Sequence, residues 1–381
     1  MKGYFRKRGD KWSFTVDVGR DPLTGKRKQK SRSGFKTKKE AEKSLNEMIY
    51  ELDKGTYFEP NNILFKDFAW EWFDNHKHRL KVTTEEQYYS KIKNHIIPFL
   101  GHYKLSDIKP VHGQAFTKHL LSIMKQSTAH KVFSITNYIL YGAVTLELIQ
   151  KNPFKNVTKP KDSRGKIDTW DFEELNAFLN FAKTYKDGFR DNPFYYRIFT
   201  VAAYTGMRKG EILGLRKQDV DFEAKKLNLR KSVIETKKAG VSTGELKTLA
   251  SYRQISIDDL LCSILKEQIL KNNSNKLRLG AAYQQNGLIF CREDGAPFRP
   301  STINKPFKIF IKKSGVKDIR FHDLRHTHAT LLLKLGVNPK IVSERLGHSN
   351  VKITLDIYSH VTSDMQEDTM FRFSEKLSKM Q

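Results

Sequence analysis

The chain has 381 residues, and its 69 Lys and Arg against 42 Asp and Glu give a formal net charge of +27. With 38% hydrophobic and 12% aromatic residues, it can build folded cores, which excludes a wholly disordered chain. The length allows two or three domains. So large a positive charge indicates an anionic partner, either nucleic acid or an anionic membrane surface.

The sequence argues against the membrane. No stretch approaches about 18 consecutive apolar residues, and the charged start from Met1 to Arg8 has no apolar segment behind it. We therefore expect neither a spanning helix nor a secretory signal, and we expect the protein in the bacterial cytoplasm. Two cysteines, Cys262 and Cys291, without a CxxC pair, predict buried reduced thiols and no disulfide framework or zinc site.

The first 39 residues form a separate basic segment, with 14 Lys and Arg against 3 acidic residues. Trp12 to Val18 alternates with period two, Asp21 to Gly25 has turn chemistry, and Lys26 to Arg32 fits a returning strand. A helix should follow this hairpin, because Thr37 and Glu40 have capping-box spacing. Its apolar stripe consists of Ala41, Leu45, Met48 and Leu52. The charge run is open to two interpretations: a solvated face, or a ribbon that enters a DNA groove.

Residues 55–62 read as a linker, and long helices are predicted beyond it. A stripe of Phe65, Phe68 and Trp72 has helical spacing, which is more typical of a buried face than of a base-stacking surface. A second capping box at residues 84–87 predicts a helix start, and Pro98 and Gly101 predict its end. The sequence thus predicts an all-helical domain over residues 63–157.

Residues 151–168 look like a second linker. Helices dominate from residue 169 onward, and strand-like runs interrupt them at residues 225–229, 253–257 and 287–290. The predicted fold is mainly α with small β-sheets. It comprises a hairpin-and-helix module at residues 1–58, the helical domain, and a mixed α/β domain at residues 168–381.

Four short segments of the last domain carry candidate chemistry. In the first, Gly206 and Gly210 bracket Arg208, and Glu211 lies three residues further on, where it shares a helix face with Arg208. Alone, this is also compatible with a structural Arg–Glu pair. In the second, residues 246–248 and 251–257 fit two arms of a hairpin with Lys247 on the first arm, although a surface lysine is the simpler interpretation.

In the third segment, His322 and Arg325 lie three apart, so a helix would aim both donors at one anion. A zinc site of His322 and His326 is the alternative, disfavoured because no further ligands are obvious and Arg325 would place a cation beside the metal. The fourth segment contains His348, ten residues before Tyr358.

In this order, the four segments resemble the tyrosine recombinases, the family of lambda-type phage and conjugative-transposon integrases. The family pattern of catalytic residues falls on Arg208, Lys247, His322, Arg325, His348 and Tyr358, and its acidic position falls on Glu211. The resemblance covers nearly the whole chain, since these integrases also have a helical core-binding domain. The basic N-terminal module resembles their arm-binding domain by composition and position.

The resemblance implies a covalent mechanism on DNA. A tyrosine phenol, with a pKa of about 10, is a weak nucleophile, and a phosphodiester repels it. Two arginines, Arg208 and Arg325, with His348 as a third donor, would neutralise the non-bridging oxygens. Tyr358 would attack phosphorus to form a 3′-phosphotyrosyl link, Lys247 would protonate the departing 5′-oxygen, and His322 would assist proton transfer. This chemistry demands no metal and no nucleotide cofactor.

The implied partners are double-stranded DNA with core-type and arm-type attachment sites, and a homotetramer on synapsed DNA. An excisionase and a host DNA-bending protein are further partners to expect of such a family. The tail from Val361 to Gln381 carries Phe373, Leu377 and Met380 at near-helical spacing, compatible with packing in cis or on a neighbour.

Three other functions fit the sequence less well. A type IB topoisomerase shares the covalent chemistry, but the separate basic module argues against it. A catalytically inactive DNA-binding architectural or regulatory protein is disfavoured because every catalytic position is filled. A structural protein that binds polyanions would explain the charge and leave the four segments unexplained.

Overall fold

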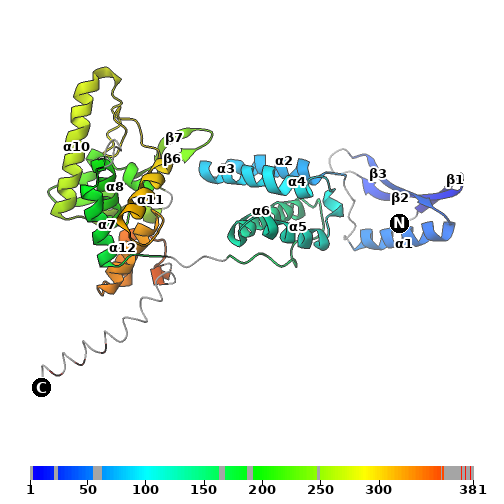
Figure 1. Ribbon diagram of the computed structural model, residues 1–381. Coiled ribbons are helices and arrows are strands. Elements are labelled where there is room, and N and C mark those ends of the chain that lie inside the picture. Colours follow the sequence, from blue (N-terminus) through cyan, green and yellow to red (C-terminus); the bar gives the residue numbers. More distant parts are fainter. Residues whose placement is uncertain are drawn as a thin grey trace. The chain divides into compact units, whose positions relative to one another are not determined.

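The computed structural model describes residues 3–20, 25–54, 62–162, 168–186, 192–246, 249–352 and 354–355, and single residues at 370, 374 and 378. The chain divides into two compact units, Met1–Ser163 and Arg164–Gln381, which are described separately (Figure 1). Helices predominate and the sheets are small, so the predicted fold class is confirmed. Within the described ranges, no helix is both long and apolar enough to cross a lipid bilayer.

The N-terminal module is a three-stranded antiparallel sheet of order β1-β2-β3 with one helix packed on it. The predicted two strands and helix are present, and the sequence reading missed the first strand. Its charged run hides the alternation by which a strand is recognised. The predicted turn falls mainly on residues 21–24, outside the described ranges. The elements are β1 Gly3–Arg8, β2 Lys11–Arg20, β3 Arg27–Phe35 and α1 Lys38–Asp53.

The two faces of this sheet differ because strand side chains alternate. Phe14 and Val16 of β2 are buried, and so are Ala41, Leu45 and Met48 of α1, in one apolar cluster. The hydroxyl of Thr37 accepts from the Glu40 amide at 3.2 Å, so the predicted cap of α1 is confirmed.

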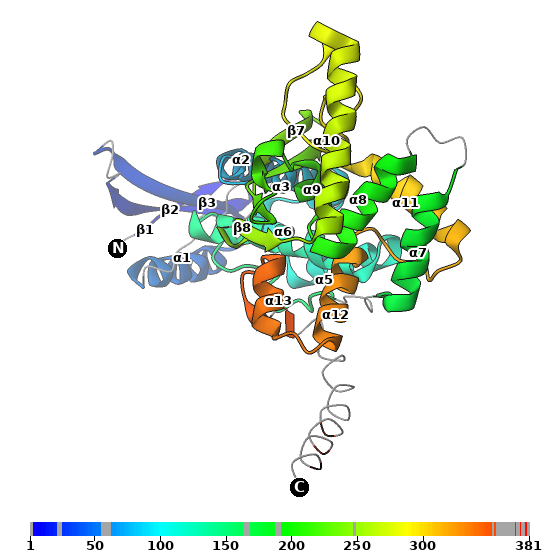
Figure 2. The same cartoon turned by 90° about the vertical axis from the view of Figure 1, so that its left-hand side faces the viewer.

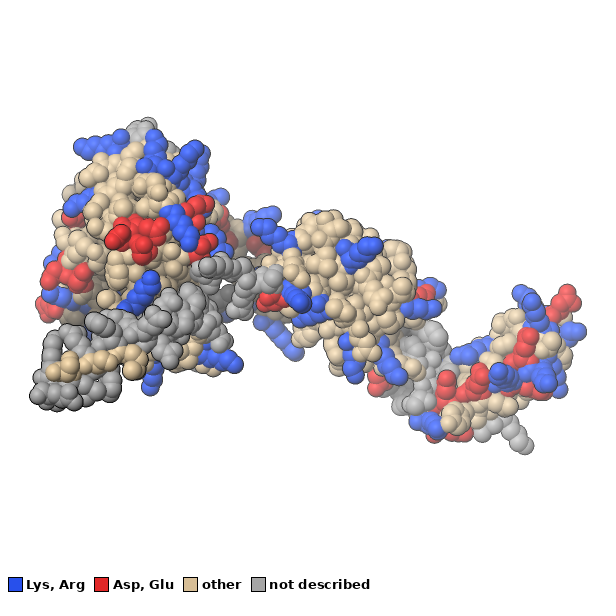
Figure 3. Space-filling model, turned by 60° about the horizontal axis from the view of Figure 1, so that its bottom comes forward, with Lys and Arg blue, Asp and Glu red and all other residues tan. Residues whose placement is uncertain are grey.

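The opposite face of the sheet is polar. Thr15 of β2 and Ser31 of β3 are hydrogen-bonded through their hydroxyls at 2.7 Å. Arg27 pairs with Asp17, so part of the positive charge is neutralised within the module. Lys and Arg side chains still cover much of the module's surface (Figure 3).

The helical domain buries the predicted stripe of Phe65, Phe68 and Trp72 in a core of its own. This confirms that these aromatic side chains belong to the interior. The elements are α2 Phe65–Lys77, α3 Val82–Lys91, the π-helix η1 Ile92–Ile96, α4 Ile97–Leu100, the 3-10 helix η2 Leu105–Asp107, α5 Pro110–Ile123 and α6 Gln126–Thr145.

In this domain the predicted start of the second helix is wrong, and of the two residues predicted to end it only Gly101 does so. Helix α3 begins at Val82, because the carbonyl of Lys81 already accepts from the Thr84 amide at 2.7 Å. Pro98 does not stop the helix, which continues as η1 and α4 to Gly101. Proline lacks an amide hydrogen, and the wider π-turn just before it, where the Ile97 amide donates to the Ile92 carbonyl, accommodates this loss.

The second unit is organised around α8, which packs against α7, α10 and α12 (Figure 2). Its core is rich in phenylalanine: Phe199 of α8 lies 5.3 Å from Phe307 and 5.4 Å from Phe310 between ring centroids. The helices are α7 Phe172–Thr184, α8 Asn192–Thr205, α9 Lys209–Leu213, α10 Asp259–Leu279, α11 Asn304–Ser314, α12 Asp323–Lys334 and α13 Pro339–Leu346, with short 3-10 helices η3 Lys217–Asp219, η4 Leu249–Ser251, η5 Gly280–Ala282 and η6 Pro300–Ile303.

Two small sheets complete this unit, of order β4-β5-β8 and β6-β7. Strand β8 pairs with β5, where Ile255 lies opposite Leu227 in the core. The first arm of the predicted hairpin, residues 246–248, lies outside the described ranges except for Leu246. The structure also has a β6-β7 hairpin, which the sequence reading missed. Residues 287–290 form only an isolated bridge between Leu288 and Arg216, and no strand. The strands are β4 Val220–Asp221, β5 Lys226–Leu229, β6 Lys231–Thr236, β7 Gly240–Glu245 and β8 Arg253–Ser256.

Candidate active site

Arg208 and Glu211 form a tight pair at the start of α9. Glu211 accepts from the Arg208 amide at 2.9 Å and from its Nη1 at 2.8 Å. The carboxylate thus caps the helix and holds the guanidinium at the same time. The Arg208 side chain is 36% exposed and that of Glu211 only 3%, so the arginine faces outward from a buried anchor.

Arg253 of β8 forms a salt bridge with Glu211 from the other side. Its Nη2 lies 3.0 Å from Glu211 Oε2, and the Arg253 side chain is also buried. Burial acts to raise the pKa of Glu211, but the charges and hydrogen bonds of Arg253 and Arg208 outweigh it and hold that pKa below its ordinary value. Glu211 is therefore an anion at neutral pH.

Arg325 of α12 reaches the same place from a third element. Its Nη1 donates to the carbonyl of Gly206 at 2.9 Å, and its Nη2 donates to that of Leu346 at 2.6 Å. Arg208 Nη2 lies 3.4 Å from the next carbonyl, that of Gly347. The two predicted phosphate-binding arginines therefore meet at the end of α13.

Glycines allow this close approach. Gly206 has φ +64°, and a Cβ there would lie 2.6 Å from a methyl carbon of Leu346. Gly347 ends α13 with φ +69°, and a Cβ there would lie 2.8 Å from the Ala250 carbonyl oxygen. Both positions need a left-handed backbone and lack room for a side chain.

His322 lies at the N-terminus of α12, one turn before His326, with the two rings perpendicular and their centroids 5.2 Å apart. Desolvation by the surrounding protein, aided by the charge of Arg325, lowers the pKa of His322 to about 4. Its imidazole is therefore neutral at pH 7 and able to accept a proton. Across the described ranges, no three His, Cys, Asp or Glu side chains form a group that could hold a metal ion.

His348 follows Gly347 and is half-buried. Its Nδ1 lies 2.8 Å from the hydroxyl of the buried Thr354. Desolvation, together with the charges of Arg325 and Arg208, lowers the pKa of His348 to about 3. A neutral His348 has one donor and one acceptor nitrogen, so its contact with Thr354 decides which nitrogen is free to donate.

The sequence reading did not identify a further group of buried polar residues. His328 Nδ1 lies 2.9 Å from the Ala203 carbonyl and its Nε2 lies 3.0 Å from Arg345 Nε, so Nδ1 donates and Nε2 accepts. Arg253 belongs to the same region. Arg253 lies two residues before the buried Ile255 in β8, so both side chains point to the inner face of the strand. This spacing could have indicated from the sequence that Arg253 faces inward.

The structure brings together Arg208, Glu211, His322, Arg325 and His348 around the α9 start, α12 and the α13 end. The two remaining predicted residues, Lys247 and Tyr358, lie outside the described ranges. Lys247 directly follows the described residue Leu246, and Tyr358 is three residues beyond the described residue Leu355.

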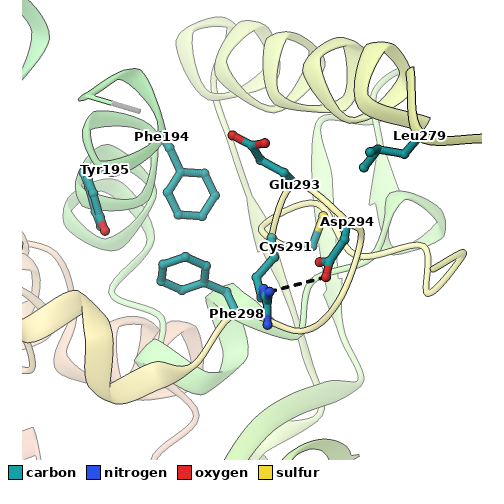
Figure 4. Close-up of a pocket in the computed structure, with 8 residues that line it drawn as sticks. Phe194, Tyr195, Leu279, Cys291, Glu293, Asp294 and Phe298 are labelled. Carbon is teal, nitrogen blue, oxygen red and sulfur yellow. Dashed lines mark ion pairs between the residues drawn. The ribbon is translucent and has the colours of Figure 1, made fainter. Parts of the chain in front are cut away.

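The other end of α8 holds a hollow of about 470 Å³, lined by Phe194, Phe298 and Cys291 with charged residues at its rim. Figure 4 shows the two phenylalanine rings side by side, with centroids 4.9 Å apart. Because α8 has 14 residues, it separates this hollow from Gly206 by about 20 Å. The hollow is therefore distinct from the arginine cluster.

Three family models match parts of this chain. The phage integrase family matches residues 169–365, more than half of the chain. The phage integrase N-terminal SAM-like domain matches residues 64–121, and an arm DNA-binding domain matches residues 4–52.

Two relatives span nearly the full length. A tyrosine recombinase XerC-like protein of Caldanaerobacter subterraneus subsp. tengcongensis is 31% identical over 376 residues, with 94% of each chain covered. The ICEBs1 integrase of Bacillus subtilis is 27% identical, over 97% of this chain and 99% of its own.

Solved structures share the fold. The Tn1549 transposon integrase in complex with a circular intermediate DNA has a TM-score of 0.68 at 21% identity, over 82% of this chain and 99% of its own. A lambda integrase tetramer bound to a Holliday junction has a TM-score of 0.56 at 19% identity, over 93% and 94%. The chain therefore belongs to the phage integrase family and is a tyrosine-type site-specific recombinase.

Proposed function

We propose that this recombinase cleaves DNA with Tyr358 and rejoins it, integrating and excising a mobile element. The observation that carries the proposal is the convergence of Arg208, Arg325 and His348 at the end of α13. Two permanent cations and a neutral donor in one place suit a phosphodiester, whose charge must be offset before a phenol can attack it.

The remaining roles follow from chemistry. Tyr358 attacks phosphorus, the bond to the 5′-oxygen breaks, and Lys247 supplies the proton to that oxygen. His322, neutral at pH 7, assists proton transfer from the tyrosine. Attack by the 5′-hydroxyl of a partner strand reverses the step and releases the tyrosine, so no energy source is consumed.

We further assign three domains and their partners. Residues 1–58 would bind arm-type sites, residues 63–157 core-type sites, and residues 168–381 the scissile strand, with four protomers on synapsed DNA in the bacterial cytoplasm. The matched relatives and the lambda integrase tetramer on a Holliday junction support this assignment. An excisionase and a host DNA-bending protein would be accessory partners.

The direct test is to locate the covalent bond. The full-length protein is incubated with core-site DNA nicked near the cleavage position, so that the short released strand is lost and the adduct accumulates. Digestion and mass spectrometry should place the nucleotide on the peptide that contains Tyr358. A nucleotide on any other residue would refute the assigned nucleophile.

Cleavage should be insensitive to EDTA, because arginine and histidine donors provide the activation of the phosphate. The measurement compares adduct formation with and without chelator. Strong inhibition that zinc or magnesium restores would instead favour His322 and His326 as metal ligands.

Thr354→Val should slow cleavage roughly 2- to 10-fold, the effect of one hydrogen bond. We expect the Thr354 hydroxyl to donate to His348 Nδ1, which leaves Nε2–H to donate to the phosphate. Thr354→Ser keeps the hydroxyl and is the control. Equal cleavage rates for the Val and Ser variants would show that Thr354 does not set the tautomer.

Removal of residues 1–60 should leave core-site cleavage intact and abolish complete integration, because the link between arm sites and core is lost. Binding to long attachment-site DNA should depend less steeply on salt, by about 0.9 in log–log slope for each phosphate contact removed. If the shortened protein integrates fully, or keeps the same slope, the basic module only aids solubility.

A further inference from the structure

We propose that Arg253 is a positioning residue of the recombinase, which fixes Arg208 and His348 relative to each other. The proposal rests on the function proposed above. Arg253 lies on β8, and its buried side chain connects the anchor of Arg208 to the helix end that precedes His348.

The contacts of Arg253 use most of its donors. Nη2 and Nη1 lie 3.0 and 3.4 Å from the two oxygens of Glu211. Nη1 also donates to the Ser251 carbonyl at 3.1 Å, and Nε donates to the Arg345 carbonyl at 2.6 Å. One planar guanidinium therefore holds a carboxylate and a helix end in fixed relative positions.

The end of α13 is held by three arginines in sequence. The carbonyl of residue 345 accepts from Arg253, that of residue 346 from Arg325, and that of residue 347 from Arg208. The last carbonyls of a helix lack partners within the helix and carry partial negative charge, so cations suit them. His348 follows directly, and its position depends on this end.

The position of Arg208 also depends on Arg253, through Glu211. Without Arg253, the buried carboxylate would lose its closest buried cation and would be left with Arg208 alone. Either a shift of Glu211 or its protonation would then change how Arg208 is held. A lysine at position 253 keeps the charge, but its three donors share one nitrogen, so it does not reproduce the separate Nε and Nη2 donors that contact the Arg345 carbonyl and Glu211.

The test compares Arg253→Lys and Arg253→Met in the full-length protein on the nicked core-site DNA. We expect each to slow adduct formation about 10- to 100-fold at saturating DNA, as small misplacements of catalytic groups do, with DNA affinity nearly unchanged. The milder lysine variant retains charge and size, so it reports on positioning if the methionine variant folds poorly. A lysine variant within about threefold of wild type would overturn the proposal.

A double-mutant cycle with Glu211→Gln separates positioning from general loss of structure. Because Arg253 acts on Arg208 through Glu211, the combined slowing in Glu211→Gln with Arg253→Lys should be smaller than the product of the two single effects. Effects that multiply would overturn the proposal. Wild-type adduct formation reports on the proposed function, and differences among variants report on Arg253, so the two can fail separately.

Arg197, near the middle of α8, provides a matched control. Its side chain is 16% exposed and pairs with Glu267 and Gln268, so it resembles Arg253 in burial and bonding but lies away from the cluster. Arg197→Lys should cleave at the wild-type rate. An equal loss in both lysine variants would show that buried arginines of this domain act only on stability, contrary to the proposal.

Discussion

Replacement of Tyr358 by Phe is expected to abolish covalent attachment to DNA while DNA binding and folding stay near wild type. Only the phenolic oxygen is removed, and this oxygen is the atom that we assign to the attack on phosphorus. The measurement is the band stable to denaturant that forms on a suicide substrate nicked near the cleavage site.

The arginine cluster provides the control for this experiment. In Tyr358→Phe, Arg208, Arg325 and His348 are all retained, so we expect the variant still to protect core-site DNA with wild-type affinity. A covalent band from the Phe variant would mean that another residue is the nucleophile. Loss of both binding and adduct would instead indicate a folding defect.

The sequence predicted those features of the chain that depend only on residues close together along one helix. The partners in the Thr37 cap and in the Arg208–Glu211 pair are three residues apart, and the structure has both. The same holds for the stripe of Phe65, Phe68 and Trp72, because helical spacing alone places these side chains on one face.

The failures concern features that depend on distant partners. The alternation around Ile255 correctly predicts a strand but not that β5 is its neighbour. Pro98 is a helix breaker in isolation, and a π-turn in the preceding residues makes it tolerable. The spacing of Arg253 from Ile255 indicates an inward side chain, but not that Glu211 and the end of α13 are its partners.

The candidate site shows the same difference between local features and those that depend on distant partners. Sequence spacing brings His322 and Arg325 onto one helix, but it does not reveal that Arg325 donates to carbonyls of residues 206 and 346. Nor does it predict that burial keeps His322 neutral. The roles of Lys247 and Tyr358 stay predictions from the family pattern.

Arg208→Ala and Arg325→Ala should each slow cleavage by at least roughly 10²- to 10³-fold, the usual effect of removing one charge-stabilising donor. Lysine should rescue poorly at either position, since it cannot form the planar fork. Adduct formation on the nicked substrate measures this, with DNA affinity as the parallel readout. Cleavage within about threefold of wild type would rule out the proposed clamp.

The two variants should differ in stability, because their surroundings differ. Arg325 is 3% exposed and satisfies two backbone carbonyls, so its loss leaves buried acceptors unpaired, at a cost of about 1–3 kcal/mol each. The Arg208 side chain is 36% exposed, so water can replace part of the hydrogen bonding that it provides to Glu211. Thermal unfolding should therefore shift to lower temperature in Arg325→Ala and much less in Arg208→Ala, although both lose cleavage. If instead Arg208→Ala were the less stable protein, Arg208 would be mainly a structural partner of Glu211, and the assignment of phosphate binding would fall to Arg325 alone.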